Sequence, residues 1–223
     1  HRNSKYAEIL LDPTAVSNEK QNSNEIYEKL YLDFNEQKYI QVIDDCNQYI
    51  LNFNGEPIVP KLEFLKALAI ARVYGFKEYE KALTFIKLNY STTIEGKEAE
   101  LILDEVLPAV QNDNFKNNKM SDNYKIIYQF TMESHDEISR QINDLKQYID
   151  NVDYLDLRVS KDFYNNIITF VVVHGLKSYD GSLGLAERLE KTIDIQADSF
   201  FVLSSDNYKT IQIHKNLDKF ENK

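Results

Sequence analysis

The sequence of 223 residues predicts an α + (α+β) fold, with a helical amino-terminal part followed by a smaller part that mixes strands and helices. Three observations lead to this prediction. Apolar residues recur at helical spacing from Asn24 to about Leu107, the stretch from Gln111 to Asn123 is polar, and beyond it apolar residues alternate as in strands. We therefore expect an extended lead-in from an upstream repeat over 1–23, a helical domain over 24–110, a linker over 111–123 and a second domain over 124–223.

The composition is that of a globular protein and argues against some classes of partner. Hydrophobic residues make up 43% of the chain, and no run of about 18 apolar residues suggests a membrane span. The net charge is −10, so we expect neither nucleic acid nor an anionic membrane surface as a partner. Cys46 is the single cysteine, which excludes an internal disulfide and a thiolate metal site. The chain begins at His1, and we interpret it as a fragment of a longer protein whose targeting or anchoring signal lies elsewhere.

Five helices fit the apolar pattern of the helical domain, and two of them begin with similar strings, KYIQVI at 38–43 and EYEKAL at 78–83. In each string a tyrosine is followed three residues later by a small or β-branched residue. This arrangement sets an aromatic ring over the next turn and lets neighbouring helices approach closely. The helices are expected at about 24–36, 38–53, 60–75, 77–89 and 94–109. The repeat-signature packing residues are Tyr39, Val42 and Cys46 in one helix and Tyr79, Ala82 and Ile86 in the other.

This pattern is typical of tetratricopeptide (TPR) hairpins, and we expect about two to two and a half TPR-like hairpins. The interval between Tyr39 and Tyr79 is 40 residues, longer than the roughly 34 residues of an ideal repeat, so an unrelated helical bundle stays open as the alternative. Upstream, SKYAEILL at 4–11 fits the last helix of a preceding repeat, stopped by Asp12-Pro13.

The order of elements after Asn123 predicts a small ferredoxin-like domain. Residues 124–130 alternate as a strand, a helix follows to Ile149, and a second strand is expected at 155–159. The string IITFVVV at 167–173 is so uniformly apolar that we expect a central strand. A helix over about 183–193 and a strand over 199–203 complete the order β-α-β-β-α-β, with both helices on one face of an antiparallel sheet.

Two stretches that contain serine are interpreted as helix caps. Ser134 lies three residues before Glu137, which is the capping-box spacing, and Ser204 or Ser205 can cap a helix that begins near Asn207. Ser134 also begins a Ser-His-Asp triplet. Adjacent residues in the first turn of a helix point in different directions, however, and cannot assemble a nucleophile with its base.

No other pattern predicts catalysis or a bound cofactor. The four histidines lack partners at metal-ligand spacing, so no metal is expected. Gly175, Gly181 and Gly184 match neither the dinucleotide-binding nor the P-loop spacing, and we interpret them as a flexible loop. We therefore expect no cofactor, no catalytic residue and a chain that is not an enzyme.

Fifteen tyrosines without a catalytic constellation favour a protein-binding module, because tyrosine rings offer rigid, amphipathic contact area. Many of them must still be core residues, since the chain has no tryptophan. The candidate protein-binding residues are Lys66 and Arg72, the cations that a peptide clamp on the inner helices would use, and Tyr208, which either packs against the sheet or faces outward.

Six strings occur in an order typical of one known family. They are YAEILLDP (6–13), IYEKLYLDFNEQKYIQVI (26–43), PKLEFLKALAIA (60–71), EYEKALTFIKLNY (78–90), ITFVVV (168–173) and FFVLSSDNYK (200–209). Together they resemble the carboxyl-terminal portion of the SprE/PorW family, the TPR-containing gliding-motility lipoproteins of the type IX secretion system. Gly181 and Gly184 depart from the pattern, since a cleaner helix start is expected there, and the terminal helix stops early at Phe220.

The resemblance implies a non-enzymatic scaffold or adaptor in the periplasm, attached to the inner face of the outer membrane by an anchor outside this fragment. Its partners are then other protein subunits of the secretion complex, and it connects the periplasmic ring to the outer-membrane translocon. Two other hypotheses stay open, a generic TPR peptide-binding adaptor and a small-ligand-binding ferredoxin-like domain, because both folds host many functions.

Overall fold

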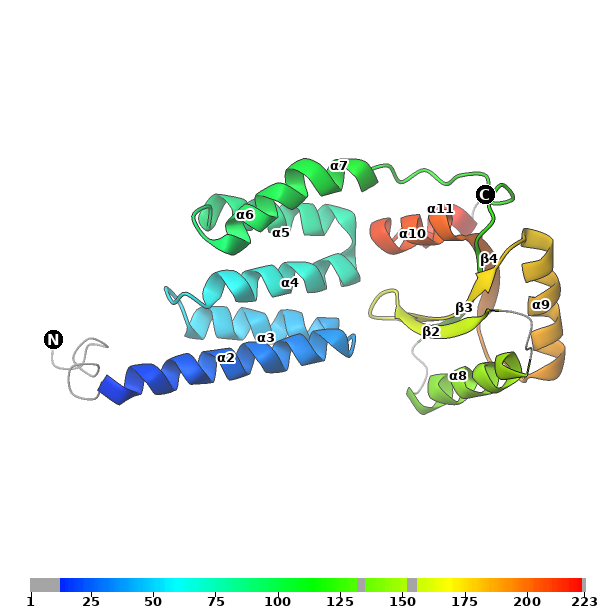
Figure 1. Cartoon of the computed structure of the whole chain (residues 1–223), viewed down its shortest axis with the longest axis horizontal. Coiled ribbons are helices and arrows are strands. Elements are labelled where there is room, and N and C mark those ends of the chain that lie inside the picture. The colour runs from blue at the N-terminus through cyan, green and yellow to red at the C-terminus, as the bar shows by residue number, and fades with distance from the viewer. Residues whose placement is uncertain (1–12, 132–134, 152–155, 222–223) are drawn as a thin grey trace. The chain divides into compact units, whose positions relative to one another are not determined.

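The computed structural model describes residues 13–131, 135–151 and 156–221, and it is rich in helices with one small four-stranded antiparallel sheet (Figure 1). The chain forms two compact units. The helical unit consists of residues 1–70 and 79–105, and the sheet unit consists of residues 71–78 and 106–223. Within the described ranges, no helix has both the length and the apolar character that crossing a membrane requires.

The helices up to residue 110 follow the apolar periodicity of the sequence. The three helices over Tyr39–Asn52, Val59–Tyr74 and Phe76–Asn89 begin and end within one residue of the ranges expected. The helices are α2 (Pro13–Asn35), α3 (Tyr39–Asn52), α4 (Val59–Tyr74), α5 (Phe76–Asn89), α6 (Ile94–Leu101), the π-helical segment η1 (Ile102–Val106) and α7 (Leu107–Val110).

The first of these helices differs from the expectation. Because α2 begins at Pro13, residues 13–23 are helical and do not form an extended lead-in. Proline is tolerated at the first position of a helix. The N–H group at that position makes no hydrogen bond within the helix, so its absence in proline costs nothing there. The expected helix over 4–11 lies outside the described residues.

The core of the helical unit is built from apolar positions on each of its helices. Small side chains contribute at several of them, which lets the helix axes approach closely. The buried apolar residues of this core include Leu30, Val42, Cys46, Leu62, Leu65, Ala67, Ala69, Leu83, Ile86 and Ala99.

The sheet has four strands in the order β2-β3-β1-β4, and every neighbouring pair is antiparallel. The strands are β1 (Tyr124–Thr131), β2 (Arg158–Phe163), β3 (Ile168–Leu176) and β4 (Ser199–Ser204). β3 pairs with β2 on one side and β1 on the other, so the uniformly apolar string does form a central strand. β2 begins at Arg158, three residues later than expected.

Helices cover both faces of this sheet. α8 (His135–Asp150) and α9 (Tyr179–Thr192) pack on one face, against a core that includes Ile126, Phe130 and Val173. α10 (Ser205–His214) and α11 (Leu217–Glu221) contribute to a second apolar cluster on the other face, with Phe170 and Leu203 among its buried members. The sheet therefore has apolar layers on both sides, which explains why residues 170–173 of β3 are apolar on both faces.

The polar segment over 111–123, expected as a linker, is bonded to the sheet unit at several points. The side-chain amide of Asn118 accepts from the Ser204 N–H at 2.7 Å and donates to the Val202 carbonyl at 2.8 Å. These two backbone groups lie on the outer edge of β4, so Asn118 satisfies them as a neighbouring strand would. The Phe115 ring packs edge-on against Phe220, with the ring centroids 5.4 Å apart.

Candidate functional site

A chain of hydrogen-bonded polar side chains crosses the sheet face that carries α10. Lys125 Nζ lies 3.0 Å from His174 Nδ1, and His174 Nε2 lies 2.7 Å from Ser160 Oγ. Ser160 Oγ in turn lies 2.7 Å from Asp162 Oδ1, and the Tyr208 hydroxyl bonds the other oxygen of that carboxylate. These five residues, which we call the polar chain, join β1, β2, β3 and α10.

Strand geometry brings the members of the polar chain together. Ser160 and Asp162 are two residues apart on β2, so both side chains point to the same face of the sheet. Ser160 pairs with Val172 in the register between β2 and β3, which makes His174 its diagonal neighbour on that face. Tyr208 reaches the same place from the first turns of α10.

The hydrogen-bond donors and acceptors of the polar chain can be assigned in one way only. The single hydroxyl hydrogen of Ser160 goes to Asp162, because a carboxylate can only accept. Ser160 then accepts from His174 Nε2, which assigns the neutral tautomer with its hydrogen on Nε2 to this imidazole. His174 Nδ1 is left to accept from the Lys125 ammonium. Donation thus runs from the Lys125 cation through His174 and Ser160 to the Asp162 anion.

The surroundings shift the pKa of three members of this chain. Burial, followed by the nearby Lys125 ammonium, lowers the pKa of His174 from 6.5 to about 4. Burial also lowers the pKa of Lys125 and raises the pKa of Tyr208, which the Asp162 carboxylate raises further. His174 is therefore neutral at pH 7, in agreement with the donor balance.

The polar chain contains serine, histidine and aspartate, but the roles differ from those of a nucleophilic triad. In a triad, the imidazole accepts the serine proton at Nε2 and a carboxylate orients its Nδ1–H group. Here Nε2 donates to Ser160, and Lys125 takes the position at Nδ1 that the carboxylate would have. The arrangement as it stands ties strands and helix together and does not activate the serine.

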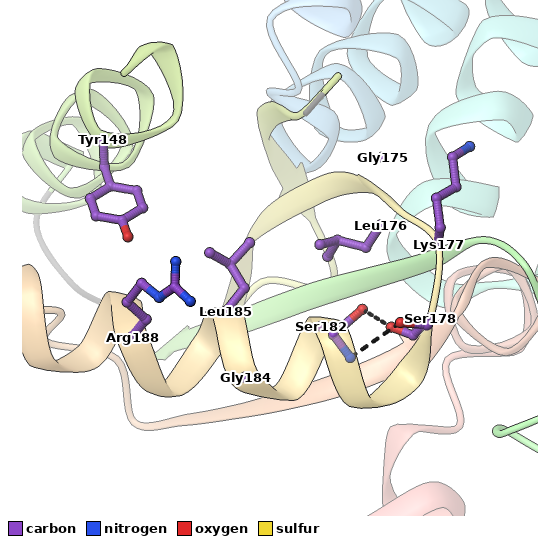
Figure 2. A pocket seen from close by; sticks show the side chains of 10 residues that line it. Tyr148, Gly175, Leu176, Lys177, Ser178, Ser182, Gly184, Leu185 and Arg188 are labelled. Carbon is purple, nitrogen blue, oxygen red and sulfur yellow. Dashed lines mark hydrogen bonds between the residues drawn. The ribbon is translucent and has the colours of Figure 1, made fainter. Parts of the chain in front are cut away.

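A pocket of about 390 Å³ lies on the other side of the sheet unit, beside the beginning of α9 (Figure 2). It is lined by Tyr148 of α8, by the turn from Gly175 to Ser178 and by residues of the first turns of α9, among them Leu185 and Arg188. Figure 2 shows the Tyr148 ring and the Arg188 side chain extending toward each other from the two helices. The glycines expected to form a flexible loop line this pocket, but Gly175 belongs to β3, and Gly181 and Gly184 belong to the capped helix α9.

The repeat-signature residues divide between buried and partly exposed positions. Tyr39, Val42, Cys46 and Ile86 are buried in the helical unit, and Tyr39 is the first residue of α3. Tyr79 is the fourth residue of α5, and both it and Ala82 are partly exposed. Burial raises the pKa of the Cys46 thiol to about 12.

The two cations expected to form a peptide clamp have different environments. Lys66 lies 2.6 Å from the Glu63 carboxylate in an ion pair whose side chains are 18% and 8% exposed. Arg72 is exposed, six residues later on α4. Because six residues turn a helix by about 600°, the two side chains point roughly 120° apart and do not form a joint site.

The expected caps can be placed for three of the four residues. Ser204 is the N-cap of α10, and its Oγ accepts from the Asn207 N–H at 3.3 Å. Ser205 is the first residue of α10, not its cap, and its buried Oγ has no partner among the described residues. Glu137 lies in the first turn of α8, 3.5 Å from Arg140, and Ser134 lies outside the described residues.

Tyr208 is a core residue and not a binding surface. Its side chain is buried, its ring lies 6.3 Å from that of Phe170, and Gln212 Nε2 donates to its hydroxyl at 3.0 Å. An aromatic ring on the first turn of a helix that packs on a sheet gains from burial there, which explains this position.

The polar chain was not predicted from the sequence. One signal was present, since Ser160 and Asp162 stand two residues apart in a strand and so share a face. Lys125 and His174 carried no signal of their own, because the strands that hold them pair across 49 residues of sequence. Among the described residues, no group of three or more His, Cys, Asp and Glu side chains is arranged to hold a metal ion.

Large apolar side chains are exposed mainly on the helices that precede the sheet. Nine of the eleven exposed ones that the structure describes lie between residues 31 and 106, and two lie further along the chain. Several stand on α5 and α6, where Phe85 and Leu88 are close in sequence and Phe85 packs edge-on against Tyr90. The nine are Tyr31, Leu32, Leu51, Tyr74, Phe85, Leu88, Ile94, Leu101 and Val106, and the two are Met120 and Ile167.

Comparisons with protein-family models, with curated protein sequences and with solved structures find no match for this chain.

Proposed function

We propose that this chain is a non-enzymatic scaffold or adaptor of the type IX protein secretion and gliding machinery, connecting the periplasmic ring to the outer-membrane translocon. The proposal rests on the resemblance of six ordered strings to the SprE/PorW family, among them FFVLSSDNYK at 200–209. It carries with it a periplasmic location at the inner face of the outer membrane and an anchor outside this fragment.

The folds that the proposal requires are TPR-like helical hairpins and a ferredoxin-like domain. For the first, the succession of helices α2 to α5 and the buried positions of Tyr39, Val42 and Ile86 are in agreement with helix-pair packing. For the second, the element order β-α-β-β-α-β and the strand order β2-β3-β1-β4 agree with a ferredoxin-like arrangement.

The observation that favours a binding role most is the concentration of exposed apolar side chains on the helices. Single exposed apolar residues are ordinary, whereas a partner that binds these helices would cover nine of them that lie between residues 31 and 106. Leu88 is 74% exposed and Ile94 is 82% exposed. Their apolar side chains are therefore in contact with water in the isolated chain, which is unfavourable in free energy. A partner that covers them would recover that free energy.

A generic TPR peptide-binding adaptor is the second candidate. It would read an acidic peptide or a free carboxyl terminus through cations on the inner helices. Lys66 is already paired with Glu63, and Arg72 points elsewhere on the same helix, which weakens this candidate. An apolar contact surface is better supported than a charged clamp.

The test is co-purification from native envelopes, read by mass spectrometry. The wild-type chain in its full-length protein is expected to retrieve subunits of the periplasmic ring and of the translocon. Leu88→Ser combined with Ile94→Ser should reduce this retrieval without lowering the melting temperature, because exposed positions contribute little to stability.

Met120→Ser combined with Ile167→Ser is the matched control, since it also removes two exposed apolar side chains, but from the sheet unit. This control is expected to retrieve the same partners as the wild type. Failure of the wild-type protein to retrieve any secretion subunit would contradict the proposed function. Equal loss in both double variants would contradict the assignment of the surface to the helices.

A further inference from the structure

The pocket beside α9 combines a floor of apolar side chains with one available cation. Leu176 and Leu185 are buried residues of the sheet unit that also line the pocket. Tyr148 and Arg188 extend into it from two helices, whereas Lys177 extends away from them (Figure 2). Among the described residues, the Arg188 guanidinium has no ion-pair partner, so its five donors are open to a ligand.

The first turn of α9 does not supply the donors of this pocket. The Gly181 N–H group is bonded to Ser178 Oγ at 3.2 Å, and the Ser182 N–H group to the Ser178 carbonyl at 3.0 Å. The Ser182 hydroxyl is bonded to that carbonyl as well, at 2.6 Å. Recognition of a negative charge in this pocket therefore falls to Arg188.

Two of the three glycines that line the pocket stand where a Cβ atom would approach a neighbouring atom too closely. Gly175 has φ = +95°, and a Cβ atom there would lie 2.1 Å from the Asp156 carbonyl oxygen. A Cβ atom at Gly181 would lie 2.7 Å from Ser178 Oγ, the atom that caps α9. Both glycines thus have an explanation in the fold.

Gly184 has no such explanation. It stands inside α9, its φ is not in the left-handed region, and a Cβ atom there would meet nothing within 4 Å. A glycine inside a helix is less favourable than alanine, because it gives up more backbone freedom on folding. What a larger residue at this position would change is the pocket, since Gly184 is part of its wall.

We propose that this pocket is a binding site for a small anion that carries an aromatic or similarly flat apolar group. Arg188 binds the carboxylate or phosphate of the ligand with its planar donor pair. The apolar body of the ligand lies against the Tyr148 ring and the leucine floor, and Gly184 leaves the space that it occupies. The volume of about 390 Å³ is within the range of small-molecule sites. This inference does not depend on the scaffold function.

The test uses benzoate and phenyl phosphate as anionic probes and benzamide as the neutral probe of the same shape. Titrated into the ¹⁵N-labelled chain, both anions are expected to bind saturably, with shifts of amide resonances concentrated between residues 175 and 188. Arg188→Gln should weaken the binding of both anions by about tenfold and the binding of benzamide by less than about twofold, because the variant removes only the charge-assisted bonds. Whichever anion binds more tightly identifies the ligand as a carboxylate or a phosphate.

Gly184→Leu should abolish binding of all three probes by filling the pocket, and Gly184→Ala, the matched control, should keep it and raise the melting temperature. Arg188 is exposed, so its variant folds even if Gly184→Leu does not. Absence of saturable binding by either anion, unchanged anion affinity in Arg188→Gln, or retained binding in a folded Gly184→Leu would each overturn the proposal.

Discussion

The side-chain amide of Asn207 bonds to both backbone groups of Lys116, 91 residues away in sequence: it accepts from the Lys116 N–H at 2.9 Å and donates to the Lys116 carbonyl at 3.1 Å. Asn207 is 1% exposed. This buried amide pairs with one backbone N–H group and one backbone C=O group of the segment over 111–123. A neighbouring strand pairs with the backbone of an edge strand in the same way.

Replacement of Asn207 by Ala should release this segment. The variant removes both bonds to Lys116 and the bond that the amide donates to Asn118 Oδ1 at 3.2 Å, so the free energy of unfolding of the sheet unit should fall by about 2–3 kcal/mol. Trypsin should then cut after Lys116 and Lys119 faster than in the wild type. Asp206→Asn, the control, breaks only the exposed ion pair between Lys116 and Asp206 and should change the free energy of unfolding by less than about 1 kcal/mol. Unaltered trypsin cleavage in Asn207→Ala would contradict the role of this amide.

Tyr208→Phe should destabilise the chain although it keeps the ring. The hydroxyl that it removes bonds Asp162 and accepts from Gln212, so the variant leaves a carboxylate oxygen short of a donor. We expect the free energy of unfolding to fall by about 1–2 kcal/mol, and by about 3–5 kcal/mol in Tyr208→Ala, which also loses the buried ring. Urea unfolding at pH 7.5 measures both. If Tyr208→Phe unfolds at the urea concentration of the wild type, the bond to Asp162 contributes no stability.

His174 should make stability depend on pH. Its pKa in the folded state, about 4, lies below its ordinary value of 6.5, so the unfolded chain binds more protons between these two pH values. The stability that the neutral imidazole contributes is therefore complete above pH 6.5 and is lost as the pH falls from 6.5 to 4. We expect a loss of about 1–2 kcal/mol, less than the full pKa shift implies, because the imidazole is only partly buried and is screened by solvent.

The comparison that isolates His174 is the free energy of unfolding of the wild type minus that of His174→Gln, measured at pH 7.5 and pH 4.5. Other groups titrate in both proteins and cancel in the difference. The difference should shrink at pH 4.5, and a difference that is the same at both pH values would show that His174 titrates as it does in the unfolded chain.

Cys46 should be unreactive while the helical unit is folded. Burial raises its pKa to about 12, and only the thiolate reacts with disulfide reagents. In Ellman's assay at pH 8 the thiol should react at least about 100-fold more slowly than in urea. Cys46→Ser in the same assay gives the background. A rate in the native chain near that in urea would mean that α3 is not packed as described.

The elements that sequence periodicity predicted are those with one dominant period. The apolar string of β3 could only be a strand covered on both faces, and α3 to α5 each carry a repeating apolar stripe. The start of α9 was expected at about 183 and lies at Tyr179, because Gly181 and Gly184 hide the helical signal that the Ser178 cap gives. The first turns of α2 were missed for a related reason, since residues 13–23 are mostly polar.

The polar contacts of the sheet unit could not be predicted in this way. Most of them join residues that are far apart in sequence, and the contacts between strands depend on a register that the sequence leaves open. Asn118 and Asn207 looked like ordinary loop and cap residues, yet their amides serve as backbone partners for β4 and for Lys116. Side-chain amides of this kind have no periodicity to detect.

The pairing of Asn118 with β4 has a consequence for self-association. An exposed strand edge is a template on which a second copy can add a strand, and chains with open edges polymerise when they are concentrated. At β4, a strand from a second copy would have to displace the Asn118 amide, which already bonds the backbone of Val202 and Ser204. At the opposite edge of the sheet, β2 carries the charged residues Arg158 and Lys161. Both edges of the sheet thus carry features that disfavour the addition of a strand. Sheet-edge polymerisation of concentrated protein is therefore disfavoured at these positions.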